Sequence, residues 1–302
     1  TTLGLSVSCG LIALLLWNFI QSDFFLKQSP FVVAQSVAQV HALPVVFGPD
    51  SLVAFSIGDV NNVNYIEPSI FNMTVSYLHL DTINGVYTPI FKKLLGYHPC
   101  SDADTPGRPG LIASIGLTNA LCLDDKDILV EGYWDEKMIY QVLVELWMCD
   151  NATSNNTCKS QEEIDAWLSD DKFFTGTLDG NVIDANDYHD PFKKKIEAVF
   201  QFIDIHLLKK MDCFFKQIEI QRNDGGFVAE LFTQHGFVRH ETQTDIKVRG
   251  PQNPLFQFQL YASKQKQIVT RRYQSFGEAL ASLSGTANFV MIFGAILARL
   301  QN

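Results

Sequence analysis

The segment DGNVIDANDYHD, which ends at Asp190, holds more residues able to bind a metal ion than any other part of the sequence. Asp179, Asn181, Asp184 and Asp187 offer oxygen atoms of the kind that Ca²⁺ uses as ligands. Their spacing differs from that of an EF-hand loop, which needs ligands at its first, third and fifth positions, Gly at the sixth and Glu at the twelfth. We therefore predict a solvated turn here, and we expect no metal and no cofactor.

Histidines and sequence motifs give little reason to expect an enzyme. The seven histidines are scattered along the chain, at His41, His79, His98, His189, His206, His235 and His240. The sequence has no H-E-x-x-H, no G-x-S-x-G, no Walker loop and no dinucleotide-binding fingerprint. We expect a protein without enzymatic activity and assign no catalytic residue.

The cysteines favour disulfide bonds. Cys149 and Cys158 bracket a short polar segment, as a disulfide that closes a hairpin does. Cys100 and Cys122 bracket the Pro/Gly-rich segment SDADTPGRPG in the same way, and neither pair has the C-x-x-C spacing of a zinc site. We predict two disulfides in an oxidising compartment. Reduced core cysteines in a cytosolic domain remain the alternative, and Cys213 is left without a partner.

Three sequons agree with an extracytoplasmic location. Asn72, Asn151 and Asn155 each begin an N-x-T triplet, and the last two lie in the polar segment CDNATSNNTCK, which is typical of an exposed loop. We predict N-glycosylation at all three, although so short a pattern also arises by chance.

Apolar segments at both ends of the sequence are candidates for helices that place the middle of the chain on one side of a membrane. Residues 1–22 carry no charged side chain, and at helical rise they measure about 33 Å, enough for one membrane span. A signal peptide is the rival interpretation, but no basic residue precedes the apolar run. We predict transmembrane helices over residues 1–22 and 277–300.

The second predicted span carries small residues at helical spacing. Ala279 to Ala298 has no ionisable side chain, and it would be about 30 Å long as a helix. The small residues that could let another helix approach closely are Gly277, Ala281, Gly285, Gly294 and Ala298. Asn288, near the middle, should find a hydrogen-bond partner inside such an interface. Two arrangements are possible: the two spans pack on each other, or they pack on another protomer or another membrane protein. Glu278, at the membrane interface, needs no special role.

Residues 23–276 form the predicted extracytoplasmic domain, in which the dominant hydrophobic period is two. Short runs such as IFNMTVSYLHL and MIYQVLVELWMC are rich in Val, Ile, Phe and Tyr, which favours strands. The clearest hairpin runs from Cys213 to Phe232, and one helix is predicted after Ser160, with Glu163 completing a capping box. The predicted fold is α+β: a mainly antiparallel, sandwich-like β domain with a minor helical insert between two transmembrane helices.

Several short segments carry a resemblance to a known set of sequences. They are TTLG, PFVVAQS, FSIGDVN, EPSIFN, CKSQEEIDAWL and RRYQSFGEALASLSG. With these segments the chain resembles the predicted two-pass transmembrane proteins of ciliated protists over most of its length. It departs from them in the last span, where Leu283-Ser284-Gly285 stands in place of the usual Ile-Gly-Gly. The resemblance implies the two-pass architecture and no enzymatic activity.

Two functions fit these predictions. The first is a non-enzymatic two-pass membrane glycoprotein that serves as a structural, adhesion or scaffold subunit of a membrane-associated assembly. The alternative is a subunit of a trimeric two-transmembrane channel laid out like purinergic receptors or epithelial sodium channels. We favour the first, because the polar residues of the second span suit helix packing as well as a pore; these are Ser282, Ser284, Thr286 and Asn288.

Charge and topology define the expected partners and location. The net charge of −10 gives no reason to expect nucleic acid as a partner. The expected partners are membrane lipid and, through the helices, other membrane proteins or copies of the chain. The short basic clusters Lys193–Lys195, Lys209–Lys210 and Arg271–Arg272 are predicted to be solvated strand ends or juxtamembrane anchors. The expected location is the plasma or ciliary membrane or an endomembrane, with the central domain extracytoplasmic.

Overall fold

The computed structural model describes residues 13–22, 30–59, 67–151, 157–168, 171–187, 189–223, 231–250 and 252–301, apart from the side chains of residues 289, 290 and 293–301. A helix over residues 13–20 precedes the labelled elements. These are β1 Phe31–Ala38, β2 Val45–Phe47, β3 Val53–Gly58, β4 Phe71–Ile83, β5 Val86–Leu95, β6 Tyr97–Pro99, the 3₁₀ helix η1 Asp102–Asp104, α3 Leu111–Ser114, β7 Leu121–Leu123, β8 Ile128–Val130, β9 Met138–Met148, α4 Gln161–Leu168, β10 Phe173–Ile183, β11 Phe192–Phe202, β12 Leu207–Asn223, β13 Leu231–Val248, β14 Phe256–Arg272 and α5 Phe276–Gln301.

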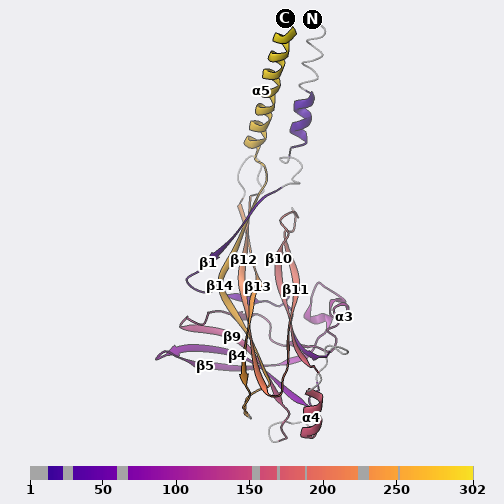
Figure 1. Ribbon diagram of the computed structural model, residues 1–302, viewed down its shortest axis with the longest axis vertical. Coiled ribbons are helices and arrows are strands. Elements are labelled where there is room, and N and C mark those ends of the chain that lie inside the picture. The colour runs from indigo at the N-terminus through magenta and orange to yellow at the C-terminus, as the bar shows by residue number, and fades with distance from the viewer. Residues whose placement is uncertain are drawn as a thin grey trace.

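The strands form two main sheets (Figure 1). The larger has seven strands in the order β13-β12-β14-β9-β4-β5, with β1 paired to β14. The smaller has five, in the order β11-β10-β3-β7-β6, and β2 and β8 form a separate pair. The pairing of β12 with β14 is parallel, whereas the other strand pairs are antiparallel. The prediction of a mainly antiparallel β domain with minor helices is confirmed.

Phenylalanines join the two sheets face to face. Phe174 of β10 packs against Phe256 and Phe258 of β14, with ring centroids 4.7 and 5.4 Å apart. Phe55 of β3 lies 6.0 Å from Phe258, and all four rings are fully buried. Gly176 lets the sheets approach, because a Cβ atom there would lie 3.1 Å from the Phe258 ring. Burial of this aromatic core between two sheets is the packing of a β-sandwich.

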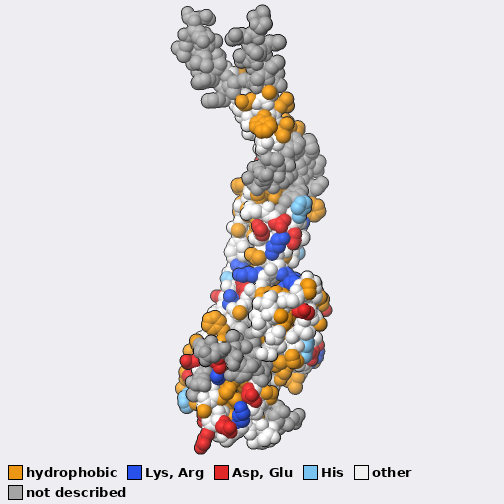
Figure 2. All heavy atoms as spheres, turned by 90° about the vertical axis from the view of Figure 1, so that its right-hand side faces the viewer, with side chains coloured by type: hydrophobic (Ala, Val, Ile, Leu, Met, Phe, Trp, Pro, Cys, Tyr) orange, Lys and Arg blue, Asp and Glu red, His pale blue; other side chains and the backbone are white. Residues whose placement is uncertain are grey.

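Long strands connect the sandwich to the helices. In Figure 1, β12, β13 and β14 extend from the sheets toward α5, which lies at the top of the view. The helix over residues 13–20 lies beside the start of α5, where the Phe19 and Phe276 rings are 6.2 Å apart and nearly perpendicular. Figure 2 shows hydrophobic side chains at this end and charged side chains spread over the domain. Among the described residues, no helix combines the length and hydropathy that crossing a membrane requires.

Two helices begin with the same capping arrangement. At α4 the Ser160 N–H donates to Glu163 Oε2 at 3.0 Å, and the Glu163 N–H donates to Ser160 Oγ at 3.4 Å, as predicted. At α5 the Ser275 N–H donates to Glu278 Oε2 at 2.9 Å, and Glu278 also pairs with Arg272 at 2.6 Å. The expectation that Glu278 needs no special role is therefore wrong, because it caps α5 and ties it to the end of β14.

The predicted hairpin is present, but its strands are longer than the sequence pattern indicated. β12 and β13 pair from Asn223↔Leu231 to Leu207↔Val248, well beyond the Cys213–Phe232 segment, and the connecting residues 224–230 lie outside the description. The proposed turn at Asp179–Asp190 is shorter than predicted, since Asp179 and Asn181 lie inside strand β10. Strand pairing with β3 and β11 on both sides extends β10 through this polar segment.

Candidate functional site

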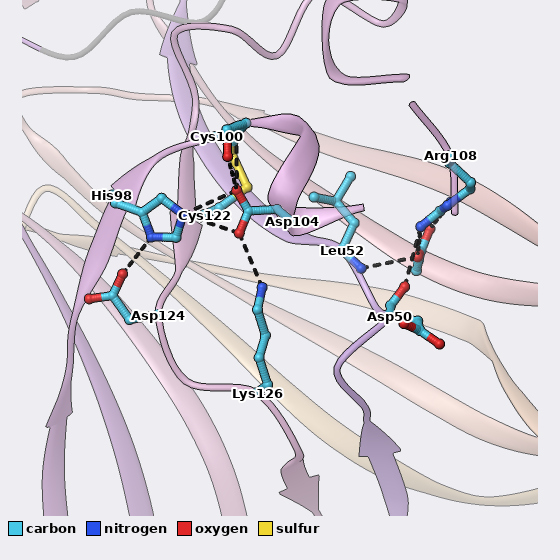
Figure 3. Close-up of polar contacts among 11 residues, drawn as sticks. Asp50, Leu52, His98, Cys100, Asp104, Arg108, Cys122, Asp124 and Lys126 are labelled. Carbon is cyan, nitrogen blue, oxygen red and sulfur yellow. Dashed lines mark hydrogen bonds and ion pairs between the residues drawn. A yellow bond between two sulfur atoms is a disulfide. The ribbon is translucent and has the colours of Figure 1, made fainter. Parts of the chain in front are cut away.

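The disulfide-closed insert between β6 and β7 contributes Asp104 and Arg108 to two clusters of paired charges. Cys100 and Cys122 are bonded at 2.03 Å, and the segment between them holds η1 and α3. A small hydrophobic cluster anchors it, with Ile112, Leu117 and Ala120 packed against Leu52 of the sandwich. The disulfide and this cluster hold charged side chains of the insert in fixed positions (Figure 3).

Asp104 is the centre of the first charge cluster and is only 2% exposed. Its carboxylate accepts hydrogen bonds from the Ser101 N–H at 2.9 Å, from His98 Nε2 at 3.1 Å and from Lys126 Nζ at 3.2 Å. Burial raises the pKa of Asp104, but the bonds from Ser101, Lys126 and His98 outweigh burial and hold that pKa below its ordinary value. Asp104 therefore stays ionised at neutral pH.

His98 bridges two carboxylates. Its Nδ1 pairs with Asp124 and its Nε2 with Asp104, so the imidazole lies between two negative charges (Figure 3). The hydrogen bond to Asp124 raises the pKa of His98, burial opposes that rise, and Asp104 adds to it. With both ring nitrogens occupied, His98 can hold a proton but is poorly placed to take one from a substrate.

A second buried carboxylate joins the insert to the sandwich. Asp179 of β10, 2% exposed, accepts hydrogen bonds from Arg108 Nη1 at 3.0 Å and from the Leu52 N–H at 3.0 Å. The Asp179 N–H in turn donates to the Leu52 carbonyl at 2.8 Å. Arg108 Nη2 also contacts Asp179, which makes the pair bidentate. Every charge in the two clusters has an opposite charge beside it, which is typical of ion pairs that stabilise a fold.

The four metal-ligand candidates do not converge. Asp179 is taken by Arg108, and Asn181 Oδ1 accepts the Phe237 N–H at 3.2 Å. Asp184 accepts the Asn186 N–H, and Asp187 accepts the N–H groups of residues 189 and 190, so both carboxylates close the turn. Among the described residues, no three His, Cys, Asp or Glu side chains are grouped to hold a metal ion.

The predicted disulfide and glycosylation sites differ in how exposed they are. Cys149 and Cys158 form the second disulfide, and Cys213 is a buried free thiol. Asn72 is half-buried in β4, and Asn151 is exposed, with its Oδ1 accepting the Cys158 N–H at 2.9 Å. Asn155 lies outside the described residues.

The small residues of α5 are placed only in part. Ala281 and Asn288 are exposed, and a Cβ atom at Gly277 or Gly285 would meet no described atom within 4 Å. The surroundings of Gly294 and the side chain of Ala298 lie outside the description, as do residues 1–12 of the first predicted span. The helix-packing surface therefore stays a prediction.

Arg271 corrects one expectation. It is fully buried, in contrast to the prediction that it forms, with Arg272, a solvated strand end or a juxtamembrane anchor. Its Nη1 donates to the Asp187 carbonyl at 2.5 Å, and its guanidinium lies 5.4 Å from the Tyr273 ring centroid. The end of β14 is thus fastened to the β10–β11 turn. Nothing in the sequence around Arg271 or Asp104 indicates that the fold buries these charged side chains.

Comparison with known proteins identifies a family but no biochemical activity. Residues 54–263 match the model of a family described as the uncharacterised 80 kDa protein N-terminal domain. None of the curated proteins matches the chain. Among solved structures it is similar to a proton-activated chloride channel, at 11% identity and a TM-score of 0.23 over 100% of this chain and 96% of that one. It is also similar to Erv41p, at 10% identity and a TM-score of 0.30 over 79% of this chain and 99% of that one. Both TM-scores are too low to carry a functional comparison.

Proposed function

Because the chain belongs to the uncharacterised 80 kDa protein N-terminal domain family, we propose its function from its own architecture. The proposal is a two-pass membrane glycoprotein whose β-rich domain faces an extracytoplasmic space. It acts without enzymatic activity, as a structural, adhesion or scaffold subunit of a membrane-associated assembly.

The observation that carries the proposal is the contact between Phe19 and Phe276, which sets the two terminal helices side by side at one end of the domain. Both segments belong to apolar stretches long enough to cross a bilayer. Exposed apolar side chains at this end, including Trp17, Leu280 and Met291, suit contact with lipid or another helix. Two anchors at one end leave the sandwich projecting to one side of the membrane.

The disulfides support the extracytoplasmic assignment. Disulfides persist in secreted and luminal compartments and are rare in the cytosol. The Cys149–Cys158 bond closes the polar segment that contains two sequons, and Asn151 at its edge is exposed. A glycan attaches to the side-chain nitrogen of asparagine, so Asn151 Oδ1 can keep its bond to the Cys158 N–H.

The charge clusters support a non-enzymatic role. Catalytic groups need access to substrate and a pKa suited to proton transfer. His98 is instead held by Asp104 and Asp124, and Asp179 is held by Arg108 and Leu52. These contacts suit a structural role for both clusters.

Glycan mapping of the full chain tests the topology. The chain is expressed in a eukaryotic cell with Asn72→Gln, Asn151→Gln or Asn155→Gln, and each is compared before and after endoglycosidase treatment. We expect the mobility shift of the wild type to shrink in at least one variant, and the chain to stay in the membrane pellet after alkaline carbonate. A chain without glycan that carbonate releases would contradict the proposal.

The mass of the gently extracted particle separates the two functions considered from the sequence. A hetero-complex is expected for a structural or scaffold subunit. A glycosylated homotrimer that conducts ions in planar bilayers would replace the proposal with the channel.

A further inference from the structure

A pocket of about 330 Å³ lies on the outer face of the larger sheet. Met211 and Cys213 of β12 belong to the core between the sheets, so Asp212, which alternates with them, points to the opposite face. Tyr261 of β14 lies on this face too, next to Leu260 of the core. The pocket is separate from the charge clusters of the disulfide-closed insert.

Aromatic rings form one wall of the pocket. Trp134 and Tyr261 meet edge to face, with centroids 6.0 Å apart at 88°, and Phe214 stacks behind Tyr261 at 5.4 Å. The Tyr87 hydroxyl donates to the Trp134 carbonyl oxygen and fixes the loop that carries this tryptophan. Trp134 is 39% exposed, so part of its surface is open to a ligand. The negative potential of aromatic faces attracts cations.

A buried carboxylate also lines the pocket. Asp212 is 4% exposed, and its Oδ2 lies 3.3 Å from Lys210 Nζ. Its Oδ1 has no hydrogen-bond partner among the described residues, whereas buried polar atoms are nearly always paired. The exposed Asp245, opposite Lys210 in the strand register, adds a second carboxylate to the lining. Two carboxylates therefore face one ammonium group.

We propose that this pocket binds a small organic ammonium ion that carries at least one N–H group. The ammonium donates to Asp212 Oδ1 and lies near the rings of Trp134 and Tyr261. Its carbon body contacts Leu80 and Ile139, which also line the pocket. The volume is near the lower end of small-molecule sites, which limits the ligand to a few carbon atoms or one ring. The two carboxylates supply too few ligands for Ca²⁺, which takes six to eight, and no group of three His, Cys, Asp or Glu among the described residues could hold a metal ion.

Calorimetric titration of the full chain in mild detergent tests the ligand class with three probes of similar shape. These are 2-phenylethylammonium, its trimethylammonium analogue and the neutral 2-phenylethanol, at equal ionic strength. We expect the first to bind at least about ten-fold more tightly than the other two, because only it combines charge with an N–H donor. Equal affinities, or no binding by the ammonium probe, would overturn the proposal.

Pocket variants test the residues. Asp212→Asn should weaken binding of 2-phenylethylammonium about ten-fold or more, through loss of a charge-assisted bond. The matched control Asp165→Asn, on α4 outside the pocket, should leave the affinity unchanged.

Lys210→Met provides a test with the opposite sign. Removal of the competing ammonium should tighten binding, an outcome that general loss of structure cannot produce. Weaker binding by a folded Lys210→Met protein, or unchanged binding by folded Asp212→Asn, would reject the assignment.

Discussion

The bidentate pair of Arg108 and Asp179 makes an asymmetric prediction about stability. The Asp179 side chain is 3% exposed, whereas the Arg108 side chain is 24% exposed and can turn toward water. Arg108→Met leaves a buried carboxylate without its counter-charge, which costs about 3–5 kcal/mol of unfolding free energy. Asp179→Asn keeps an oxygen that can accept the Leu52 N–H and loses one charge-assisted contact, at about 1.5–3 kcal/mol.

We therefore expect Arg108→Met to destabilise the domain by about 4 kcal/mol and Asp179→Asn by about 2 kcal/mol. The double variant removes both charges, so its cost should fall short of the sum of the single costs by about 1–3 kcal/mol.

Urea denaturation of the full chain in detergent, with disulfides intact and tryptophan fluorescence as the signal, measures all four proteins. Additivity within about 0.5 kcal/mol would show that the two side chains do not interact. A larger cost for Asp179→Asn than for Arg108→Met would refute the argument from burial.

Four other predictions concern single residues. The pKa of His98 is raised in the folded state, so protonated His98 stabilises the fold fully below its unfolded pKa of about 6.5. This stabilisation is lost as the pH rises through the pKa of the folded state. His98→Gln should therefore flatten this part of a curve of unfolding free energy against pH. Phe174→Ala should lower the unfolding free energy by about 3–5 kcal/mol, measured by urea denaturation, because the ring is fully buried between the sheets. Gly132→Ala should cost at least about 1 kcal/mol in the same assay, since φ is +88° and the new Cβ would lie 2.2 Å from the Met138 carbonyl oxygen. Burial raises the pKa of Cys213 to about 12, so mass spectrometry should find its peptide labelled by maleimide only after unfolding.

Local signals predicted the local elements of this fold. The period of two in IFNMTVSYLHL and MIYQVLVELWMC became β4 and β9, which pair with each other. The capping box at Ser160 became the start of α4, because its donors and acceptors lie three residues apart and need no distant partner. The cysteine spacing led to both disulfides for a related reason, since each closes a short segment.

Long-range features lay beyond the sequence signals. The parallel pairing of β12 with β14 joins strands that the sequence reads as separate runs. Asp179 and Arg108 are far apart in the chain, and nothing at either position indicates the other. Arginine is usually found at the surface, yet the β10–β11 turn covers Arg271. The buried Asp212 is likewise visible only after the sheet is assembled.

The continuity of β14 with α5 has a mechanical consequence. Only residues 273–275 separate the two elements, and β14 lies parallel to β12 from Lys209↔Phe256 to Asn223↔Arg272. Tension along α5 would act along the axis of β14 and load its bonds to β12 together, in shear, so that they could not open one after another. Force spectroscopy with one handle at the end of α5 and the other at Leu207, the first residue of β12, would measure this as a single high-force rupture. A displacement of α5 along its axis would thus be transmitted along β14 to the far end of the domain.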